Sequence, residues 1–482
     1  MRHLPSTLFL FVATATHAGA QIIEIPTVPV RREQLKSDIP SVTRSMGHIS
    51  IAVRDELTDP FVNPADIMHG AGTTVFLSPG IISWSQEHTT AQMSARGNVI
   101  ISAEQHEASV LSASAGIVHR TGATGMAALA GLQLHSGEAG TERVSPVDPF
   151  YNNHRRQLSY HGRRFPVMVA FAGTLPESKI ALGGSFAWTS INGNDEIRLR
   201  SGYDTRIEPA GNQYDARFGA ALRDGAADAG LVVGYSSINL DHGPSPLITH
   251  TSGTWLARMK YRMPLSDQVD IGVQATVNRM QHRRSPHFGN PRTTTTAYAF
   301  DIGIGSSWKR PWGMLALEYL IEPVSSVVMF EHVDFVPDTE GRLVEGSSRQ
   351  LAQVDMMWMH HVMRAGLEFG ILPQTTLRLG SQARTGSLAY SCTNNVGHMT
   401  SEEKRRDSWT LACTGGVDVE LGVCRLNAGA EILLRHNVPG PVPPATSWPR
   451  TPEVSCDIPA DPLTEPSILT GRLALIWTLG AE

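Results

Sequence analysis

Side chains that could perform chemistry are spread thinly along this chain of 482 residues. The G-x-S-x-G pattern, which would place a nucleophilic serine on a tight turn, does not occur in the sequence. His360 and His361 are adjacent, and adjacent residues of a strand point to opposite faces, so the pair is not expected to bind one metal ion. We therefore expect no enzyme activity, no cofactor and no metal site. The function has to come from the architecture that positions the polar residues.

A hydrophobic period of two dominates the sequence from about residue 160 onward, over segments of about ten residues. Between Val269 and Asn278, apolar side chains alternate with polar or very small ones. Successive residues of a strand point to opposite faces, so each such segment predicts a strand with one apolar and one polar face. Sixteen segments between residues 73 and 479 are predicted as strands in this way.

The predicted connections alternate in length, which favours a transmembrane antiparallel β-barrel over a soluble β-sandwich or propeller. Short turns are expected at residues 175–178, 224–225, 264–267, 309–313, 372–374 and 424–425, and long external loops at 137–163, 325–350, 386–407 and 437–465. The polar faces carry charges of both signs, which a wet lumen tolerates and which would pair across it or with a plug. The charged residues expected to face the lumen are Arg258, Lys260, Asp301, Glu318, Arg364, Glu368, Arg378 and Glu431.

The first twenty residues have the features of a secretory signal peptide. Met1, Arg2 and His3 precede a short apolar run, and Ala18-Gly19-Ala20 offers a cleavage site. The run is much shorter than the ~20 apolar residues of a spanning helix, and no later stretch reaches that length. We therefore expect an exported protein that starts at Gln21. With 40 basic and 45 acidic residues, the charge balance gives no case for a nucleic-acid partner.

Export would permit disulfides among the four cysteines, Cys392, Cys413, Cys424 and Cys456. Four thiols allow three pairings. The predicted topology places Cys392 and Cys456 in external loops and Cys413 near the root of a loop, whereas Cys424 lies at a short periplasmic turn. We expect Cys392 to pair with Cys413 or with Cys456, and Cys424 to stay unpaired.

The segment that precedes the predicted barrel carries a motif. Residues 44–55 read Arg-Ser-Met-Gly-His-Ile-Ser-Ile-Ala-Val-Arg-Asp, and Asn63-Pro64-Ala65 follows. This segment resembles the N-terminal hatch of the outer-membrane long-chain fatty-acid transporter family (FadL type) and its PorV-type relatives, with the pattern R-x-M-G-x-A-x-x-A-x-x-D followed by N-P-A. The chain departs from that pattern at Gly47-His48-Ile49, where Gly-Gly-Ala is common, and at Asp55-Glu56, where paired aspartates are frequent.

The resemblance implies a plug over residues 21–70 and a barrel over residues 71–482, with fourteen strands where the periodicity gives sixteen. It implies plug or gate roles for Arg44, Met46, Gly47, Asp55, Asn63, Pro64 and Ala65. It also implies a monomer in the lipid of the bacterial outer membrane that passes hydrophobic small molecules inward without a cofactor. The alternative is a PorV-like protein that binds, shuttles or anchors exported proteins at loops 386–407 and 437–465. A general diffusion porin is disfavoured by the hatch.

Overall fold

The computed structural model describes most of the predicted plug and barrel. The described residues are 39–69, 72–93, 99–144, 155–199, 204–224, 227–241, 249–284, 292–337, 339, 343–394, 401–436 and 467–479. The predicted signal peptide and the first part of the predicted plug lie outside them.

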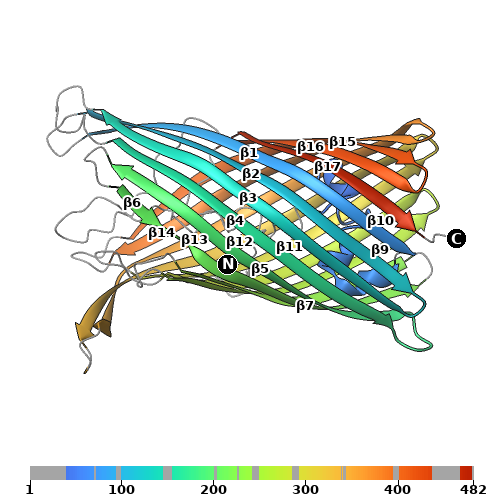
Figure 1. Cartoon of the computed structure of the whole chain (residues 1–482), viewed down its shortest axis with the longest axis horizontal. Helices are drawn as coiled ribbons and strands as arrows, with labels where there is room; N and C mark the ends of the chain where they lie inside the picture. Colours follow the sequence, from blue (N-terminus) through green and yellow to red (C-terminus); the bar gives the residue numbers. More distant parts are fainter. Residues whose placement is uncertain are drawn as a thin grey trace, which may run out of the picture.

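In the described part of the chain, sixteen antiparallel strands close into a barrel (Figure 1). The barrel strands are β1 (Thr73–Met93), β2 (Val99–Thr121), β3 (Thr124–Val144), β4 (Arg155–Thr174), β5 (Ile180–Leu199), β7 (Ala210–Asp224), β8 (Ala227–Asp241), β9 (Thr249–Ser266), β10 (Val269–Arg284), β11 (Arg292–Arg310), β12 (Gly313–Pro337), β13 (Leu343–Leu372), β14 (Thr375–Asn394), β15 (Ser401–Leu421), β16 (Cys424–His436) and β17 (Ser467–Leu479). Strand β1 pairs with both β2 and β17, which closes the sheet. The short strand β6 (Asp204–Ile207) pairs with β5 before β7 begins. The number of strands lies at the upper end of the expected range and agrees with the periodicity.

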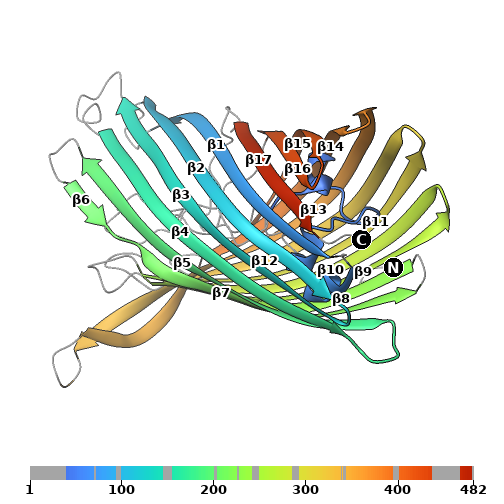
Figure 2. The same cartoon turned by 45° about the vertical axis from the view of Figure 1, so that its right-hand side comes forward.

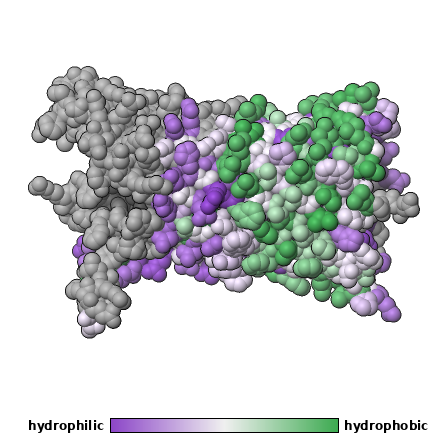
Figure 3. Space-filling model, viewed as in Figure 1, coloured by the Kyte–Doolittle hydropathy of each residue, from purple (hydrophilic) through white to green (hydrophobic). Residues whose placement is uncertain are grey.

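The outer face of the barrel is apolar where the strands approach their short turns (Figure 3). On β9 the outward side chains of Trp255 and Met259 are 61% and 55% exposed, and on β8 Leu231 is 50% exposed while its neighbour Val232 is buried. This alternation confirms the predicted strand period. A broad band of exposed apolar side chains on a closed barrel is stable in lipid and not in water, so the barrel is transmembrane.

Three of the predicted external loops contain strand, so their prediction as loops was wrong. Strands β3 and β4 continue into residues 137–144 and 155–163, β12 and β13 into 325–337 and 343–350, and β14 and β15 into 386–394 and 401–407. The hairpin of β12 and β13 projects beyond the rest of the barrel (Figure 2). In these segments apolar residues do not alternate regularly with polar ones, so the signal that reveals a strand is lost there. The predicted loop 437–465 lies outside the described residues.

A small plug fills the end of the barrel that carries the short turns (Figures 1 and 2). It contains the helices α3 (Val42–Ser45) and α4 (Asp59–Val62) and the 3₁₀ helix η2 (Pro64–His69), and β1 follows. Within the described ranges, no helix is long and apolar enough to cross a membrane.

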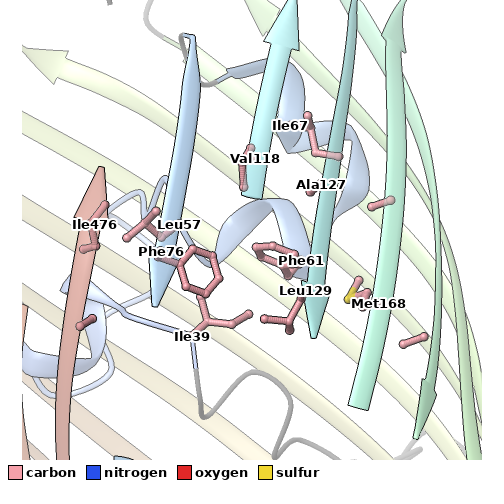
Figure 4. Close-up of a cluster of buried hydrophobic side chains, with 13 residues drawn as sticks. Ile39, Leu57, Phe61, Ile67, Phe76, Val118, Ala127, Leu129, Met168 and Ile476 are labelled. Carbon is pink, nitrogen blue, oxygen red and sulfur yellow. The ribbon is translucent and has the colours of Figure 1, made fainter. Parts of the chain in front are cut away.

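One side of the plug packs against an apolar part of the inner wall (Figure 4). Phe61 of the plug meets Phe76 of β1 edge-on, with ring centroids 6.2 Å apart. The plug residues of this apolar cluster are Ile39, Leu57, Phe61 and Ile67, and the wall residues include Phe76, Val118, Leu129, Met168 and Ile476. Complete burial of one such large side chain stabilises the folded state by about 1.5–3 kcal/mol. Strands β17 and β1 to β5 therefore form an apolar wall that holds the plug.

Candidate functional site in the plugged lumen

The carboxylate of Asp55 organises the inside of the plug. Its Oδ2 accepts hydrogen bonds from Ser41 Oγ at 2.6 Å and from Thr43 Oγ1 at 3.2 Å. Its Oδ1 accepts the backbone N–H groups of Leu57 and Thr58 at 3.1 and 3.2 Å. The side chain is buried, and each hydrogen bond to a charged group contributes about 1.5–3 kcal/mol. Asp55 thus joins the two halves of the plug.

The Met46-Gly47 segment lies directly against the backbone of the barrel. Gly47 has a φ of +76°, and its N–H donates to Thr414 Oγ1 at 2.8 Å. A Cβ atom at Gly47 would lie 2.6 Å from the carbonyl oxygen of Ser381. The wall residue opposite is also a glycine, Gly366. A Cβ atom there would lie 2.6 Å from the carbonyl oxygen of Met46. Only glycine allows plug and wall to approach so closely.

Glu318 of β12 holds the next turn of the plug. Its Oε1 accepts the N–H of Ser50 at 2.7 Å, the N–H of Ile51, and the N–H of Ala52 at 3.3 Å. Arg364 of β13 lies 3.4 Å from the other carboxylate oxygen and donates to Ser50 Oγ at 3.4 Å. Three consecutive backbone amides thus surround one wall carboxylate, as in backbone nests that bind anions.

A second wall carboxylate, Glu431 of β16, binds two side chains of the plug, Arg44 and His48. Arg44 lies 3.4 Å from its Oε2, and His48 Nε2 lies 3.1 Å from its Oε1. Burial lowers the pKa of His48, although Glu431 acts in the opposite direction. His48 adopts a φ of +63°, which directs the chain from the wall back into the plug.

A third ionic contact joins the plug to β8 and β9, where Arg54 of the plug and Arg262 of β9 share Asp228 of β8. The Arg262 nitrogen is 2.7 Å from the Asp228 carboxylate. Glu318, Glu431 and Asp228 come from different parts of the wall, so the plug is held on several sides.

The Asn63-Pro64-Ala65 corner packs against glycines of β5 and β7. Asn63 Oδ1 accepts the N–H of Ala65 at 3.2 Å, and Asn63 Nδ2 donates to the carbonyl of Ala220 at 3.3 Å. A Cβ at Gly219 would lie 1.8 Å from Asn63 Oδ1, and one at Gly183 would lie 2.6 Å from the backbone of Pro64. The corner therefore fits a wall that lacks side chains at these two positions.

The structure places all eight charged residues expected in the lumen on the inner face, but only some contact the plug. Glu318, Arg364 and Glu431 hydrogen-bond to the plug. Arg378 instead pairs with two wall residues, Glu368 at 2.6 Å and Asp418. Arg258, Lys260 and Asp301 lie on the inner faces of β9 and β11. Sequence reasoning missed several members of the site, and their strand phase could have revealed them: Asp228, Glu322, Arg384, Thr414 and Asp418.

The adjacent histidines point to opposite faces, as expected. His360 faces the lumen beside Arg384, at 3.4 Å, and His361 faces outward, where its Nδ1 lies 2.7 Å from Tyr319 Oη.

Among the described side chains, Cys413 and Cys424 are free thiols, and Cys413 is exposed on the outer face. A bridge from Cys413 to Cys392 is therefore not what the structure shows. The side chain of Cys392 and all of Cys456 lie outside the described part of the chain.

The sequence matches no family model, and no curated protein matches it. Solved structures resemble the barrel only distantly. A deletion mutant of the TodX monoaromatic hydrocarbon channel has a TM-score of 0.43 and 12% sequence identity, with 91% of this chain and 99% of that chain covered. The toluene transporter TbuX of Ralstonia pickettii has a TM-score of 0.39 and 12% identity, covering 92% and 98%. A FadL homologue of Pseudomonas aeruginosa has a TM-score of 0.40 and 8% identity, covering 98% and 100%. None of these likenesses assigns the chain to a family.

Proposed function

We propose that this protein is a monomeric transporter of the bacterial outer membrane, similar to the fatty-acid transporter family, that lets hydrophobic small molecules enter passively. The observation that carries the proposal is a plug bound on one side by an apolar wall and on the other by wall carboxylates. A diffusion porin for polar solutes needs an open wet lumen, and a plug works against it.

The location follows from the barrel. Closed barrels and helices are the structures that satisfy all backbone hydrogen bonds in lipid. Even-numbered antiparallel barrels with short turns at one end are the form found in bacterial outer membranes, and the apolar outer band would contact the lipid there. Closure leaves no free edge strand, so the barrel needs no second copy to complete its sheet.

The apolar wall also supports a path for the substrate. The ladder between β3 and β4 runs through Ala130 and Val167, stops, and resumes at Gln133 and Arg164. The interruption lies at Pro166, which has no N–H to donate. It is next to Leu129 and Met168 of the apolar cluster. We infer that a hydrophobic molecule leaves the lumen near this interruption or after movement of the plug.

Native mass spectrometry of the full chain in mild detergent tests the proposal. A copurified apolar molecule at about one per barrel is expected. An empty barrel with a stoichiometric protein partner would contradict the proposal and favour the PorV-like alternative, a protein that binds exported proteins. Of the two segments on which that alternative rests, residues 386–394 and 401–407 belong to β14 and β15, and residues 437–465 lie outside the described ranges.

A further inference from the structure

A row of buried polar side chains crosses the inner wall just beyond the plug, on the side of the long loops. Arg258 of β9 lies opposite Thr276 of β10, and Thr276 lies opposite Asp301 of β11. Farther along the same row, Glu322 of β12 lies opposite His360 of β13. We call these five residues the polar row.

At β12 and β13, apolar residues border the polar row on both sides. Toward the plug, Leu320 and Val362 lie opposite each other and contact Ile51, a plug residue. Toward the long loops, Val324 lies opposite both Ala299 and Trp358. Each border lies two residues, or roughly 7 Å, from the polar row along the strands. At β12 and β13 the polar row therefore interrupts an apolar stretch of the inner wall.

Two oxygen atoms of the polar row have no hydrogen-bond partner among the described residues. They are Asp301 Oδ1 and Thr276 Oγ1. Asp301 is 4% exposed and Thr276 is 1% exposed. Direct cross-strand neighbours have Cβ atoms about 4.5–5.5 Å apart, so one small polar group can reach both oxygens. Buried polar atoms are nearly always paired, so this pair points to a ligand.

The ladder between β11 and β12 is also interrupted at this place. It runs through Ala299 and Val324, stops, and resumes at Ile302 and Ile321. Asp301 lies in the interruption, across from the segment that holds Glu322 and Pro323. The polar row is thus a local irregularity of an otherwise regular wall.

The charges around Asp301 indicate that the ligand is neutral. The charged neighbours of Asp301 are Glu322 and the guanidinium groups of Arg258, Arg384 and Arg364. Arg384 lies 2.6 Å from Glu322, and Arg364 lies 3.4 Å from Glu318. Arg384 and Arg364 are thus already paired with wall carboxylates and would not neutralise an anionic ligand. A charged ligand would add an uncompensated charge in a region of low dielectric constant, which is unfavourable.

We propose that Asp301 and Thr276 bind the hydroxyl group of a neutral hydroxylated hydrocarbon, such as an alkylphenol. The ligand hydroxyl donates to Asp301 Oδ1 and accepts from Thr276 Oγ1, while its hydrocarbon part contacts Val324 and Trp358. A carboxylate ligand would face the carboxylates of Asp301 and Glu322, and a pure hydrocarbon would leave both oxygens unpaired. This inference rests on the proposed uptake of hydrophobic molecules and specifies their class.

Binding of three molecules of similar size to the full chain in detergent tests the inference: 4-propylphenol, butylbenzene and 4-propylbenzoate. We expect the wild-type barrel to bind the phenol at least about tenfold more tightly than the other two, because a buried polar atom left without a hydrogen bond costs about one factor of ten or more in affinity. Thr276→Val and Asp301→Leu should remove this preference. Because all variants are compared in one detergent, partition into micelles cancels.

Ser307→Ala is the matched control. Ser307 lies on the same inner face of β11, is buried, and has no hydrogen-bond partner among the described residues, but it stands six positions from Asp301. This variant should keep the preference for the phenol. Folding is checked by heat-modifiable electrophoretic mobility. If Asp301→Leu does not fold, Thr276→Val decides, because valine and threonine have the same shape.

Equal affinity of the wild-type barrel for the phenol and butylbenzene would overturn the inference and leave the proposed function standing. A preference that survives in Thr276→Val and Asp301→Leu would also overturn it. A folded barrel that binds none of the three molecules would contradict both the inference and the proposed function.

Discussion

Glu318 accepts the backbone N–H of Ser50 at 2.7 Å, although the two residues are 268 positions apart in the chain. The same oxygen accepts the N–H groups of Ile51 and Ala52. A single carboxylate of the wall therefore fixes the turn of the plug formed by residues 50–52. Any inward movement of the plug has to break this contact.

Glu318→Gln should loosen that turn. Glutamine keeps an oxygen acceptor but loses the charge, and charge-assisted hydrogen bonds are about twice as strong as neutral ones. We expect the amides of Ser50, Ile51 and Ala52 to exchange with deuterium roughly tenfold faster, which corresponds to a loss of about 1.4 kcal/mol. Glu368→Gln is the control, because Glu368 pairs with Arg378 of the wall. Equal exchange in both variants would show that Glu318 does not hold the plug.

Gly47→Ala should weaken the plug more than Gly122→Ala. Both glycines have positive φ, so alanine costs about 1 kcal/mol at either position for the backbone alone. At Gly47 the new Cβ would also lie 2.6 Å from the Ser381 carbonyl oxygen, whereas nothing lies within 4 Å of a Cβ at Gly122. Limited proteolysis of the plug should be several-fold faster in Gly47→Ala only. Similar rates would mean that the close approach is unimportant.

Gly219→Leu should displace the Asn63-Pro64-Ala65 corner and alter uptake of a hydrophobic substrate. Its Cβ would lie 1.8 Å from Asn63 Oδ1. Gly184→Leu is a matched control on the neighbouring strand, because Gly184 is exposed on the outer face and its Cβ would have 3.9 Å to the nearest atom. Uptake by intact cells, normalised to the amount of folded barrel, should change several-fold in Gly219→Leu. Unchanged uptake in both variants would make the corner purely structural.

The plug should become more stable as the pH falls toward 6 and below, because the carboxyl group of Asp59 becomes protonated. Burial raises the pKa of Asp59 from 3.8 to about 6; Asp66 and Asp55 act in the same direction, and Lys260 opposes them. The protonated carboxyl is thus favoured in the folded plug. This stabilisation is complete below pH 3.8 and is lost as the pH rises through about 6.

Asp59→Asn removes the titrating group and should flatten this part of the pH dependence between pH 4 and 7. Hydrogen exchange of the plug amides at several pH values measures this pH dependence of plug stability. His48 is left unchanged in both proteins, so its own titration cancels. A slope that is the same in Asp59→Asn and in the wild type would exclude Asp59 as the cause.

The strands of the wall could be predicted from the sequence, whereas the contacts between the wall and the plug could not. Alternation such as that of Val273 and Gln274 marks a strand because one side chain meets lipid and the next meets the lumen. It also assigns Glu318 and Glu431 to the inner face. Their partners Ser50 and His48 are hundreds of residues away, and no local pattern relates the two members of each pair.

Other features of the fold were beyond a single sequence for separate reasons. Residues 325–337 read as a loop because their apolar side chains come in a run, from Val327 to Phe330, and do not alternate with polar ones. Asp55 could be selected through its motif, but its role in joining Ser41 and Leu57 depends on how the plug folds back on itself. The count of fourteen strands came from the resemblance, and the periodicity of this chain gave the number that the structure has.

The most direct test of the central claim is the initial rate of uptake of a radiolabelled alkylbenzene by Gram-negative cells that lack their own hydrocarbon channels. Intact cells are needed because such molecules cross simple lipid vesicles unaided. Cells that produce this protein should take up the label several-fold faster than cells with an empty vector, and collapse of the proton gradient should leave the initial rate unchanged. Equal rates in the two kinds of cell, with folded barrel present in the outer membrane, would contradict the account.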